Sequence, residues 1–234
     1  MGGSIPRRSR VSHVALGRAD YGWTLDLQRT LHGRRRAGEI ADVVLTAEHN
    51  PVMTFGRSGS RDHLLVPESE LRREGIELFE VERGGDVTYH GPGQLVVYPI
   101  VDLRDHGRDI RRFIRCLEDA AIGTLGEIGI DAGRREGFPG VWVDRRKIAS
   151  IGVYVRGWVS LHGLALNVAV NPAHFAMIRP CGLSVETVSI VDLIGRTVSL
   201  DRIRDLFLVQ MDAAFGWEFE PTGLAEVLGM EGGG

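Results

Sequence analysis

The sequence predicts a single α+β domain, and three observations support this class. The chain has 234 residues, which suffice for one sizeable domain, and it shows no internal repeat and no linker. Apolar runs at 41–49 and 95–103 are typical of buried strands, and residues 141–170 predict an antiparallel meander. Between these strands, residues 109–128 carry apolar side chains at helical spacing. Strands and helices are thus interleaved in one body, which we place at 12–229.

The elements in the first part of the chain are expected to alternate between short strands and helices. Asp20 can cap a helix in which Trp23, Leu27 and Leu31 follow four-residue spacing. The glycine, serine and charged residues of 52–65 predict a loop. The regular elements expected here, in order, are a strand at 12–16, the helix after Asp20, a strand at 41–49, a helix from Pro67 to Leu71, and strands at 76–82 and 95–103.

The second half of the chain is expected to hold the longest helix and the meander. In the helix at 109–128, Cys116 lies one position off the apolar stripe, where it can serve as a small packing residue. The basic start, 1–11, and the glycine-rich end, 230–234, predict flexible or disordered tails. The elements expected after the helix are strands at 141–143, 147–155 and 158–170, helical turns at 171–178, and a last helix from Asp201.

The composition argues against several classes of protein. No apolar run reaches the ~20 residues that span a bilayer, and the first ten residues lack the apolar segment of a secretory signal. A net charge of −3 argues against a nucleic-acid partner. Two cysteines without a histidine cluster make neither a disulfide framework nor a metal site. We therefore expect a cytoplasmic protein with no metal, no membrane contact and no nucleic acid.

Residues 83–99 form a glycine-rich stretch that leads into the strand at 95–103. Glycine has no Cβ, so the bends at 84–85 and 91–93 can bring backbone close to a ligand or to another segment. The spacing of the glycines matches neither the dinucleotide-binding fingerprint nor the P-loop. Polar side chains surround the bends, namely Arg83, Thr88, Tyr89, His90 and Gln94. On residue types alone, two interpretations stay open: a pair of tight turns, or a substrate-binding loop.

The predicted meander carries small residues on neighbouring strands. Period 2 puts Ser150 and Gly152 on one face of their strand, and Gly163 and Ala165 on one face of the next. Small residues that face the same way leave volume above a sheet. Either a helix packs closely into that volume, or a ligand groove occupies it.

Two residues could carry chemistry. Cys181 sits between Pro180 and Gly182, where a regular element cannot continue and a loop can present the thiol. A free thiol has a pKa of about 8.5, so a neighbouring cation is needed to favour the nucleophilic thiolate. Lys147 is the only lysine among 28 lysine and arginine residues. Taken alone, the residue types favour a structural cysteine at 181 and a solvated surface charge at Lys147, with a catalytic role as the alternative for each.

The glycine-rich stretch carries the pattern R-G-G-x-x-T-Y-H-x-x-G-Q-x-x-x-Y from Arg83 to Tyr98. It resembles the signature of the lipoyl(octanoyl) transferase family of lipoate biosynthesis. Four further segments match the family in the same order, at 48–59, 140–153, 161–168 and 178–183, so the resemblance covers most of 14–195. It implies an α+β fold with a central mixed β-sheet flanked by helices, as in the catalytic domain of biotin and lipoate protein ligases.

The resemblance also implies a site and its residues. The position of Cys181 carries the acyl group as a thioester in the family, and that of Lys147 completes a Cys/Lys dyad. His162 lies in a matched segment and is equally compatible with a buried structural histidine. The substrate-binding positions implied are Arg83, Gly84, Gly85, Asp86, Val87, Thr88, Tyr89, His90, Ser150, Ile151, Gly152, Gly163, Leu164 and Ala165. Two departures, Asn50 for a proline and Met53 for an aromatic residue, fall in the segment after the second strand.

The implied reaction moves an octanoyl group from octanoyl-acyl carrier protein to a lysine of a lipoyl domain. The acceptors would be the E2 subunits of 2-oxoacid dehydrogenases and the glycine-cleavage H protein. No cofactor is expected, because the acyl donor travels on the phosphopantetheine of its carrier. Two alternatives remain. One is an ATP-dependent lipoate or biotin protein ligase on the same fold, and the other is a non-catalytic module that binds acyl carrier protein.

Overall fold

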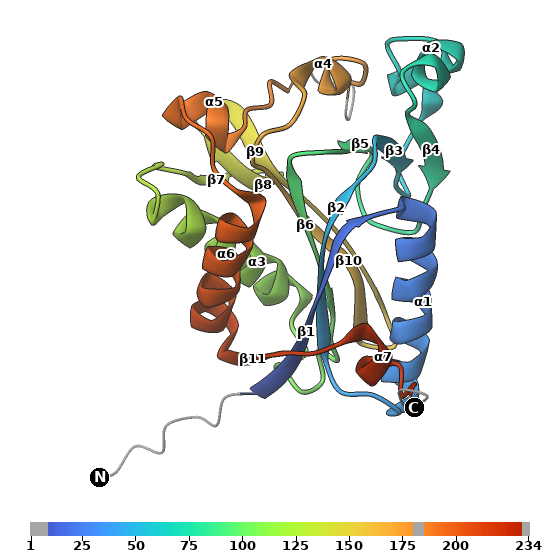
Figure 1. Ribbon diagram of the computed structural model, residues 1–234, viewed down its shortest axis with the longest axis vertical. Helices are drawn as coiled ribbons and strands as arrows, with labels where there is room; N and C mark the ends of the chain where they lie inside the picture. Colours follow the sequence, from blue (N-terminus) through green and yellow to red (C-terminus); the bar gives the residue numbers. More distant parts are fainter. Residues whose placement is uncertain (1–8, 180–184, 231–234) are drawn as a thin grey trace.

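The structure, a computed structural model, describes residues 9–179 and 185–230 and is built around a mixed β-sheet. Within these residues the sheet has eight strands in the order β11-β1-β2-β6-β10-β9-β8-β7 (Figure 1). β1 pairs in parallel with β2 and β11, whereas the other neighbours are antiparallel. The strands are β1 (Ser9–Ala19), β2 (Val43–His49), β6 (Gln94–Ile100), β7 (Gly133–Arg135), β8 (Phe138–Val143), β9 (Arg146–Arg156), β10 (Val159–Asn167) and β11 (Trp217–Pro221). The predicted α+β class with a central mixed sheet is confirmed.

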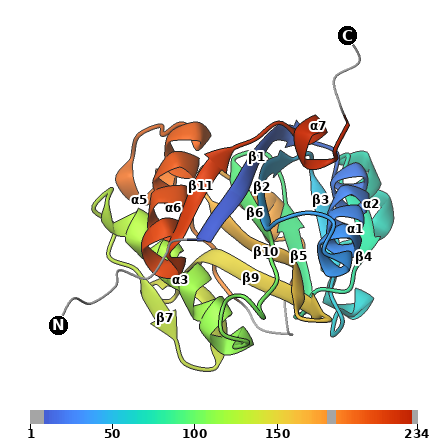
Figure 2. The ribbon, with the colours of Figure 1, turned by 90° about the horizontal axis from the view of Figure 1, so that it is seen from below.

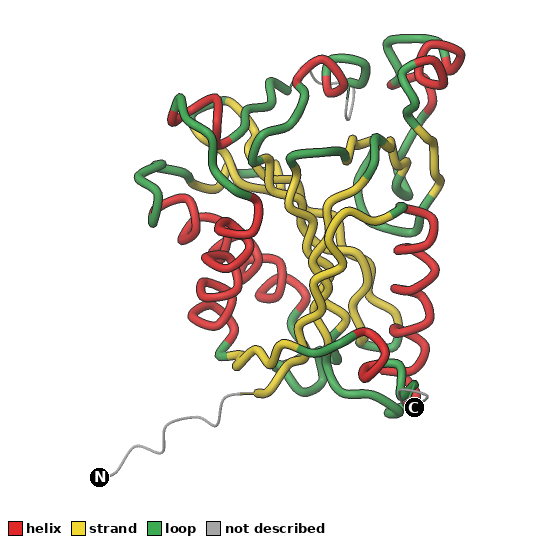
Figure 3. The backbone as a smooth tube through the Cα atoms, viewed as in Figure 1, coloured by secondary structure: helices red, strands yellow, loops and turns green. Residues whose placement is uncertain are grey.

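Helices cover both faces of this sheet, so the strands form the middle layer (Figure 3). α1 (Tyr21–Ala37) lies on one face, and α3 (Ile110–Gly126) and α6 (Leu200–Phe215) lie together on the other (Figures 1 and 2). Each face has its own apolar core. Since both faces are covered, every residue of β6 is buried, which explains the continuous apolar run seen in its sequence.

Local capping signals set the starts of the long helices. The Asp20 carboxylate accepts the Trp23 N–H at 2.8 Å, and the α1 helix ends at Gly38 in a left-handed conformation. In α3, Asp109 accepts the Arg112 N–H at 3.0 Å. The cap at Asp20 was predicted from the sequence, and the helix at 109–128 was predicted from its apolar spacing; the structure confirms both helices.

A second sheet of three strands lies beside one end of the first, next to α2 (Glu68–Arg73) (Figure 1). Its order is β4-β3-β5, formed by β3 (Val52–Phe55), β4 (Glu77–Glu80) and β5 (Val87–His90). The prediction of a loop at 52–65 is therefore wrong at its start. All four residues of β3 are buried, and pairing with both neighbours outweighs the weak local signal.

The second sheet also changes how two earlier predictions are understood. β5 is a strand inside the glycine-rich stretch, so the true loops there are shorter than expected. Met53, a departure from the family pattern, is fully buried and packs with Leu71 and Tyr89 in the small core of this sheet. It therefore affects packing and not an exposed loop, whereas Asn50 is exposed at the turn between β2 and β3.

Smaller differences occur near the ends of the chain. β1 begins at Ser9, so residues 9–11 belong to the sheet and not to the expected tail. β11 was not predicted; its register pairs Trp217 with Ser9, so its partner lies at the far end of the sequence. Residues 1–8 and 231–234 lie outside the described residues.

The remaining short elements are η1 (Arg61–His63), α4 (Pro172–Phe175), α5 (Ile190–Ile194) and α7 (Leu224–Val227). Among the described helices, none combines the length and apolarity that crossing a bilayer requires.

Candidate active site

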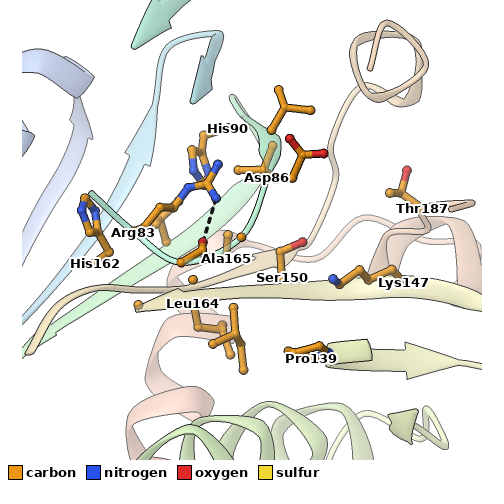
Figure 4. A pocket seen from close by; sticks show the side chains of 18 of the residues that line it. Arg83, Asp86, His90, Pro139, Lys147, Ser150, His162, Leu164, Ala165 and Thr187 are labelled. Atoms are coloured by element: carbon orange, nitrogen blue, oxygen red, sulfur yellow. Dashed lines mark hydrogen bonds between the residues drawn. The ribbon is translucent and has the colours of Figure 1, made fainter. Parts of the chain in front are cut away.

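A cavity of about 190 Å³ lies where the glycine-rich loop meets β9 and β10. It extends along the two strands, with Lys147 near one end and His162 at the other (Figure 4). Apart from Tyr89, each of the predicted substrate-binding residues lines this cavity, and so does Lys147. The fold therefore brings together three segments that the sequence separates widely, namely 83–90, 147–152 and 162–165.

Several lining residues were not predicted as site residues. Tyr98 and His162 fall in segments quoted for the family resemblance, which was the available signal. No sequence signal marked Tyr21 or Phe175 as site residues. Tyr21 reaches the cavity through the packing of α1, and Phe175 through the packing of α4. The unpredicted lining residues are Tyr21, Val96, Tyr98, Pro139, His162, Phe175, Val185 and Thr187.

Backbone hydrogen bonds hold the glycine-rich loop in place over the sheet. The Gly84 N–H donates to the carbonyl of Val153 on β9 at 3.0 Å, and the Arg57 N–H donates to the carbonyl of Arg83 at 3.0 Å. A Cβ on Gly56 would lie 2.4 Å from the carbonyl oxygen of Gly85. The close approach of these two segments therefore requires glycine at 56, and the loop forms a firm wall of the cavity.

Arg83 organises this wall from within. Its side chain is buried, and its guanidinium donates to the carbonyl of Thr54 at 2.6 Å and to that of Gly84 at 3.1 Å. Burial lowers the pKa of the Arg83 guanidinium, because the charged form loses hydration. The side chain thus ties β3 to the loop, while part of it remains at the cavity surface.

A buried hydrogen-bond chain sets the tautomer of His90, and burial keeps the ring neutral. The Gln94 amide Nε2 donates to Tyr89 O at 3.3 Å and to Asn167 Oδ1 at 2.9 Å, so its Oε1 accepts the Nδ1–H of His90 at 2.7 Å. Burial, with the nearby His49 adding to it, lowers the pKa of His90 to about 3. His90 therefore stays neutral, with Nε2 as a hydrogen-bond acceptor beside the cavity.

Tyr89 lies on the other side of β5 and does not reach the cavity. It is buried, and its hydroxyl lies 2.7 Å from His174 Nδ1. Its ring makes edge contacts with His174 and Phe175. Successive side chains of a strand face opposite ways, so the structure separates Tyr89 from His90 although both belong to one motif. Tyr89 supports α4, which in turn places Phe175 at the cavity.

The small residues of β9 and β10 make room mainly for other parts of the protein. A Cβ on Gly152 would lie 3.0 Å from Gly84 O and 3.1 Å from Arg83 Cδ. A Cβ on Gly163 would lie 2.1 Å from Val97 O and 2.8 Å from Pro99 Cδ. Of the two uses left open for these small residues, close packing and a ligand groove, Gly163 serves close packing, although against a strand and not a helix. The absent side chain lets β6 approach β10, and the Ser150–Ala165 pair lies open toward the cavity.

Gly163→Ala is therefore expected to destabilise the fold. The new methyl group would meet a strand carbonyl that cannot rotate away, and overpacking of this kind typically costs ~1–3 kcal/mol. Urea unfolding of the two proteins measures the difference. Gly33→Ala in α1 is the matched control, since a Cβ there meets nothing within 4 Å, and it should leave the unfolding midpoint unchanged or raise it. A Gly163→Ala protein of unchanged stability would contradict this packing.

His162 closes the end of the cavity that is distant from Lys147 (Figure 4). It adopts a left-handed backbone conformation with φ 60, which is uncommon for a residue other than glycine. Its backbone N–H donates to Gln28 Oε1 at 3.2 Å, and its Nε2 lies 3.7 Å from Glu82 Oε2. Burial lowers the pKa of His162. This end of the cavity is thus formed by a buried imidazole held between Gln28 of α1 and Glu82, which follows β4 and directly precedes the glycine-rich loop.

Lys147 lies near the start of β9, where a separate segment pairs with it. Its N–H donates to Glu186 O at 2.8 Å, and its carbonyl accepts the Val188 N–H at 3.0 Å. Thr187 and Val185 of that segment line the cavity together with Lys147. Asn167, which bonds Gln94, also donates to Val188 O at 3.2 Å. Asn167 therefore links the hydrogen-bond chain of His90 to the segment that pairs with Lys147.

The structure describes one of the two cysteines. Cys116 is a free, buried residue of α3, as predicted, and burial raises the pKa of its thiol. Cys181 lies outside the described residues. Phe175 and Val185, which lie on either side of 180–184 in the sequence, both line the cavity. Among the described residues, no group of histidine, cysteine and acidic side chains has the arrangement of a metal site.

Comparison with known proteins identifies the family. Residues 20–212 match the model of the lipoyl protein ligase A/B catalytic domain. The chain is 48% identical to an octanoyltransferase of Solibacter usitatus, covering 88% of this chain and 93% of that protein. It is 43% identical to an octanoyltransferase of Syntrophobacter fumaroxidans, covering 91% and 93%.

Solved structures agree on the fold. A lipoate-protein ligase A bound with ATP superposes with a TM-score of 0.72 at 17% identity, covering 94% of this chain and 90% of that one. A biotin protein ligase of Aquifex aeolicus gives a TM-score of 0.52 at 10% identity, covering 88% and 70%. These structural similarities show the fold alone, whereas the sequence relatives identify the family. The chain belongs to the lipoyl protein ligase A/B catalytic-domain family, as one of its octanoyltransferases.

Proposed function

We propose that this octanoyltransferase acts by covalent catalysis, with Cys181 as the nucleophile and Lys147 as its acid–base partner. One observation supports this most directly. Lys147 lies in the cavity beside Val185 and Thr187, which come just after the segment that contains Cys181. The chain entering that segment also passes the cavity, at Phe175. Residues that precede and follow Cys181 in the sequence thus border the cavity that Lys147 lines, which supports pairing the Cys181 thiol with the Lys147 ammonium.

In the first half-reaction, the Cys181 thiolate attacks the carbonyl carbon of an octanoyl thioester. The new carbon–sulfur bond forms an octanoyl-Cys181 thioester, and the bond to the carrier's sulfur breaks. Lys147 as ammonium would stabilise the attacking thiolate and then donate its proton to the departing thiolate. One thioester replaces another, so the step is nearly balanced in free energy and is driven onward by the second half.

In the second half-reaction, the neutral amine of an acceptor lysine attacks the octanoyl-Cys181 carbonyl. Lys147, now neutral, takes the proton that the amine loses, and the Cys181 thiolate leaves. An amide forms from a thioester, which is favourable and returns both residues to their starting state. Splitting a transfer into two substitutions of this kind is ordinary nucleophilic catalysis.

The cavity suits an octanoyl chain lying along the two strands. Its walls include the apolar side chains of Val96, Ile151 and Leu164, beside the small Ala165. Burying an alkyl chain there is favourable by about 0.8 kcal/mol per methylene. The chain would lie with its thioester at Lys147 and its methyl end directed toward His162.

We assign the donor as octanoyl-acyl carrier protein and the acceptor as a lysine of a lipoyl domain, on an E2 subunit or the glycine-cleavage H protein. The octanoyltransferase relatives and the lipoate ligase fold support a lipoyl-domain protein as substrate. One solved neighbour, with a TM-score of 0.70, is a lipoate protein ligase described together with its E2 lipoyl domain from Thermoplasma acidophilum. A thiolate nucleophile suits a reducing compartment, so we place the reaction in the cytoplasm.

Intact-mass spectrometry after incubation with octanoyl-acyl carrier protein tests the covalent step. We expect one octanoyl group per chain, released by hydroxylamine and mapped by peptide analysis to Cys181. Addition of a lipoyl domain should discharge the adduct and add the same mass to that domain. An adduct on Cys116, or transfer without any adduct on the enzyme, would contradict the mechanism.

We further expect that ATP neither binds nor accelerates the transfer, and that no cofactor is needed. Octanoyl is already activated as a thioester, so forming the amide requires no adenylate, and the sequence carries no phosphate-binding fingerprint. Calorimetry with MgATP and transfer assays with and without nucleotide measure this. Micromolar affinity, or transfer from free octanoate and ATP, would favour an ATP-dependent ligase instead.

A further inference from the structure

Lys147 faces an aromatic ring across the sheet. In the register of β8 and β9, Trp142 lies directly opposite Lys147. The Lys147 ammonium Nζ lies 5.3 Å from the centroid of the Trp142 ring. An ammonium within about 6 Å of an indole centroid is attracted by the electron-rich face of the ring, and tryptophan is the strongest aromatic partner for a cation.

The orientation of the Trp142 ring is set by its surroundings. The side chain is buried, and its indole N–H donates to the carbonyl of Phe138 at 3.1 Å. The Phe138 ring meets it edge-on at 6.1 Å. The guanidinium of Arg135 lies 5.1 Å from the same indole centroid and 4.5 Å from the Phe138 ring. Two cations therefore share one rigidly held indole.

Gly140 provides the path along which the lysine side chain runs. A Cβ at this position would lie 2.6 Å from Lys147 Cε and 3.3 Å from Nζ. Gly140 also has φ +119, a conformation that other residues rarely adopt. The lysine stem thus crosses the bare backbone of β8. Its direction is fixed by a glycine beneath it and an indole at its end.

We propose that Trp142 is a positioning residue for Lys147, holding the ammonium over its indole face so that it points along the cavity toward the reacting thioester. This inference rests on the proposed role of Lys147 in acyl transfer. Trp142 itself does not line the cavity, so it touches no substrate and acts through Lys147. The attraction exists only for the charged form, so Trp142 also favours the protonated state of Lys147.

Arg135 has the opposite effect on the lysine. It is a like charge on the same ring, and like charges disfavour each other's protonated state. The Trp142 ring therefore raises the pKa of Lys147 and Arg135 lowers it, so the two effects oppose each other. The charged residues on the elements packed against Lys147 include Arg134 and Arg135 on β7, Glu118 on α3, Arg146 on β9, Glu186 on the paired segment, and Asp86 across the cavity.

The sequence permits a direct test, because Lys147 is the only lysine of the chain. Protein grown with 13C,15N-lysine gives NMR signals from this side chain alone. In the wild type, the ε-methylene protons are expected upfield of a free lysine, since they adjoin an Nζ that lies 5.3 Å from the indole centroid. Trp142→Leu should remove the upfield shift and move the titration midpoint of Lys147 to lower pH by about one unit. Arg135→Gln, an exposed change, should move the midpoint to higher pH.

Kinetics separate positioning from packing. Trp142→Leu should lower kcat by about tenfold or more and shift the alkaline limb of the pH profile to lower pH, with little change in the KM for the octanoyl donor. Trp142→Phe should restore part of the lost kcat and part of the pH shift, because phenylalanine keeps an aromatic ring that attracts a cation more weakly than indole does. Trp158→Phe is the matched control: Arg108 lies 5.5 Å from the centroid of that ring, neither residue lines the cavity, and the pH profile of this variant should be unchanged.

The outcomes distinguish this inference from the proposed function. A lysine signal without an upfield shift in the wild type, or an unchanged midpoint in a folded Trp142→Leu protein, would overturn the positioning role. Loss of activity with an unmoved pH profile would reduce Trp142 to a packing residue. Full transfer by Lys147→Ala would instead remove the dyad from the mechanism, while the NMR result would still report where Trp142 holds the lysine.

Discussion

Cys181→Ser is expected to lose octanoyl transfer by a factor on the order of 10⁴ or more, as removal of the nucleophile commonly does in covalent enzymes. The physical reason lies in the acidity of the two groups. A thiol near a cation ionises close to neutral pH, whereas a serine hydroxyl does not, and Lys147 is suited to stabilise a thiolate. The loss should appear in a transfer assay with octanoyl-acyl carrier protein and a lipoyl domain, and the intact mass should show no adduct.

Cys116→Ala is the matched control for this change. Cys116 is buried in α3, and burial raises the pKa of its thiol, so Cys116 is a poor nucleophile. It also does not line the cavity. Its variant should keep both transfer and adduct formation. Both variants should show wild-type thermal unfolding to within a few degrees. If Cys181→Ser retained transfer with no adduct on the enzyme, the reaction would have to proceed by direct attack of the acceptor amine on the donor thioester.

Lys147→Arg and Lys147→Ala are expected to separate two roles of the lysine. A positive charge by itself stabilises the Cys181 thiolate, and arginine supplies that charge. Proton transfer needs a group that can release its proton, which arginine effectively never does in a protein, whereas a partly buried lysine can. Lys147→Arg should therefore keep much of the reactivity of Cys181 toward an alkylating agent, yet lose acyl transfer ~10²–10⁴-fold, the usual size of a general acid–base contribution.

Alkylation rates across pH and turnover measurements on the three proteins make this comparison. Lys147→Ala should lose both reactivity and transfer. The larger arginine must still fit over Gly140, where the lysine stem passes closely, so near-UV circular dichroism should accompany the assays. Full transfer by a folded Lys147→Arg protein would leave the lysine an electrostatic role and exclude its role as a proton carrier.

Much about this protein was determined by its sequence alone. Asp20 predicted the start of α1, and the apolar spacing at 109–128 predicted α3, because capping and helical periodicity both depend on residues a few positions apart. The apolar run of β6 identified a strand buried on both faces. The motif from Arg83 to Tyr98 pointed to the octanoyltransferases, which the relatives confirm. Such features are local, so the pattern of neighbouring residues suffices.

The tertiary structure decided the features that depend on distant partners. β3 became a strand by pairing with β4 and β5, and β11 by pairing with β1 at the other end of the chain. The sequence placed Tyr89 beside His90, but the pleat of β5 sends only His90 to the cavity.

The same holds for the parts of the site that are made by contact. Glycine at 163 proved to admit the backbone of β6, because what fills the space of an absent Cβ depends on the neighbouring strand. Trp142 meets Lys147 only because the register of β8 and β9 sets them opposite each other. Pairing register and packing arise from the whole chain folding together, and a one-residue slip would turn each of these side chains to the other face of the sheet.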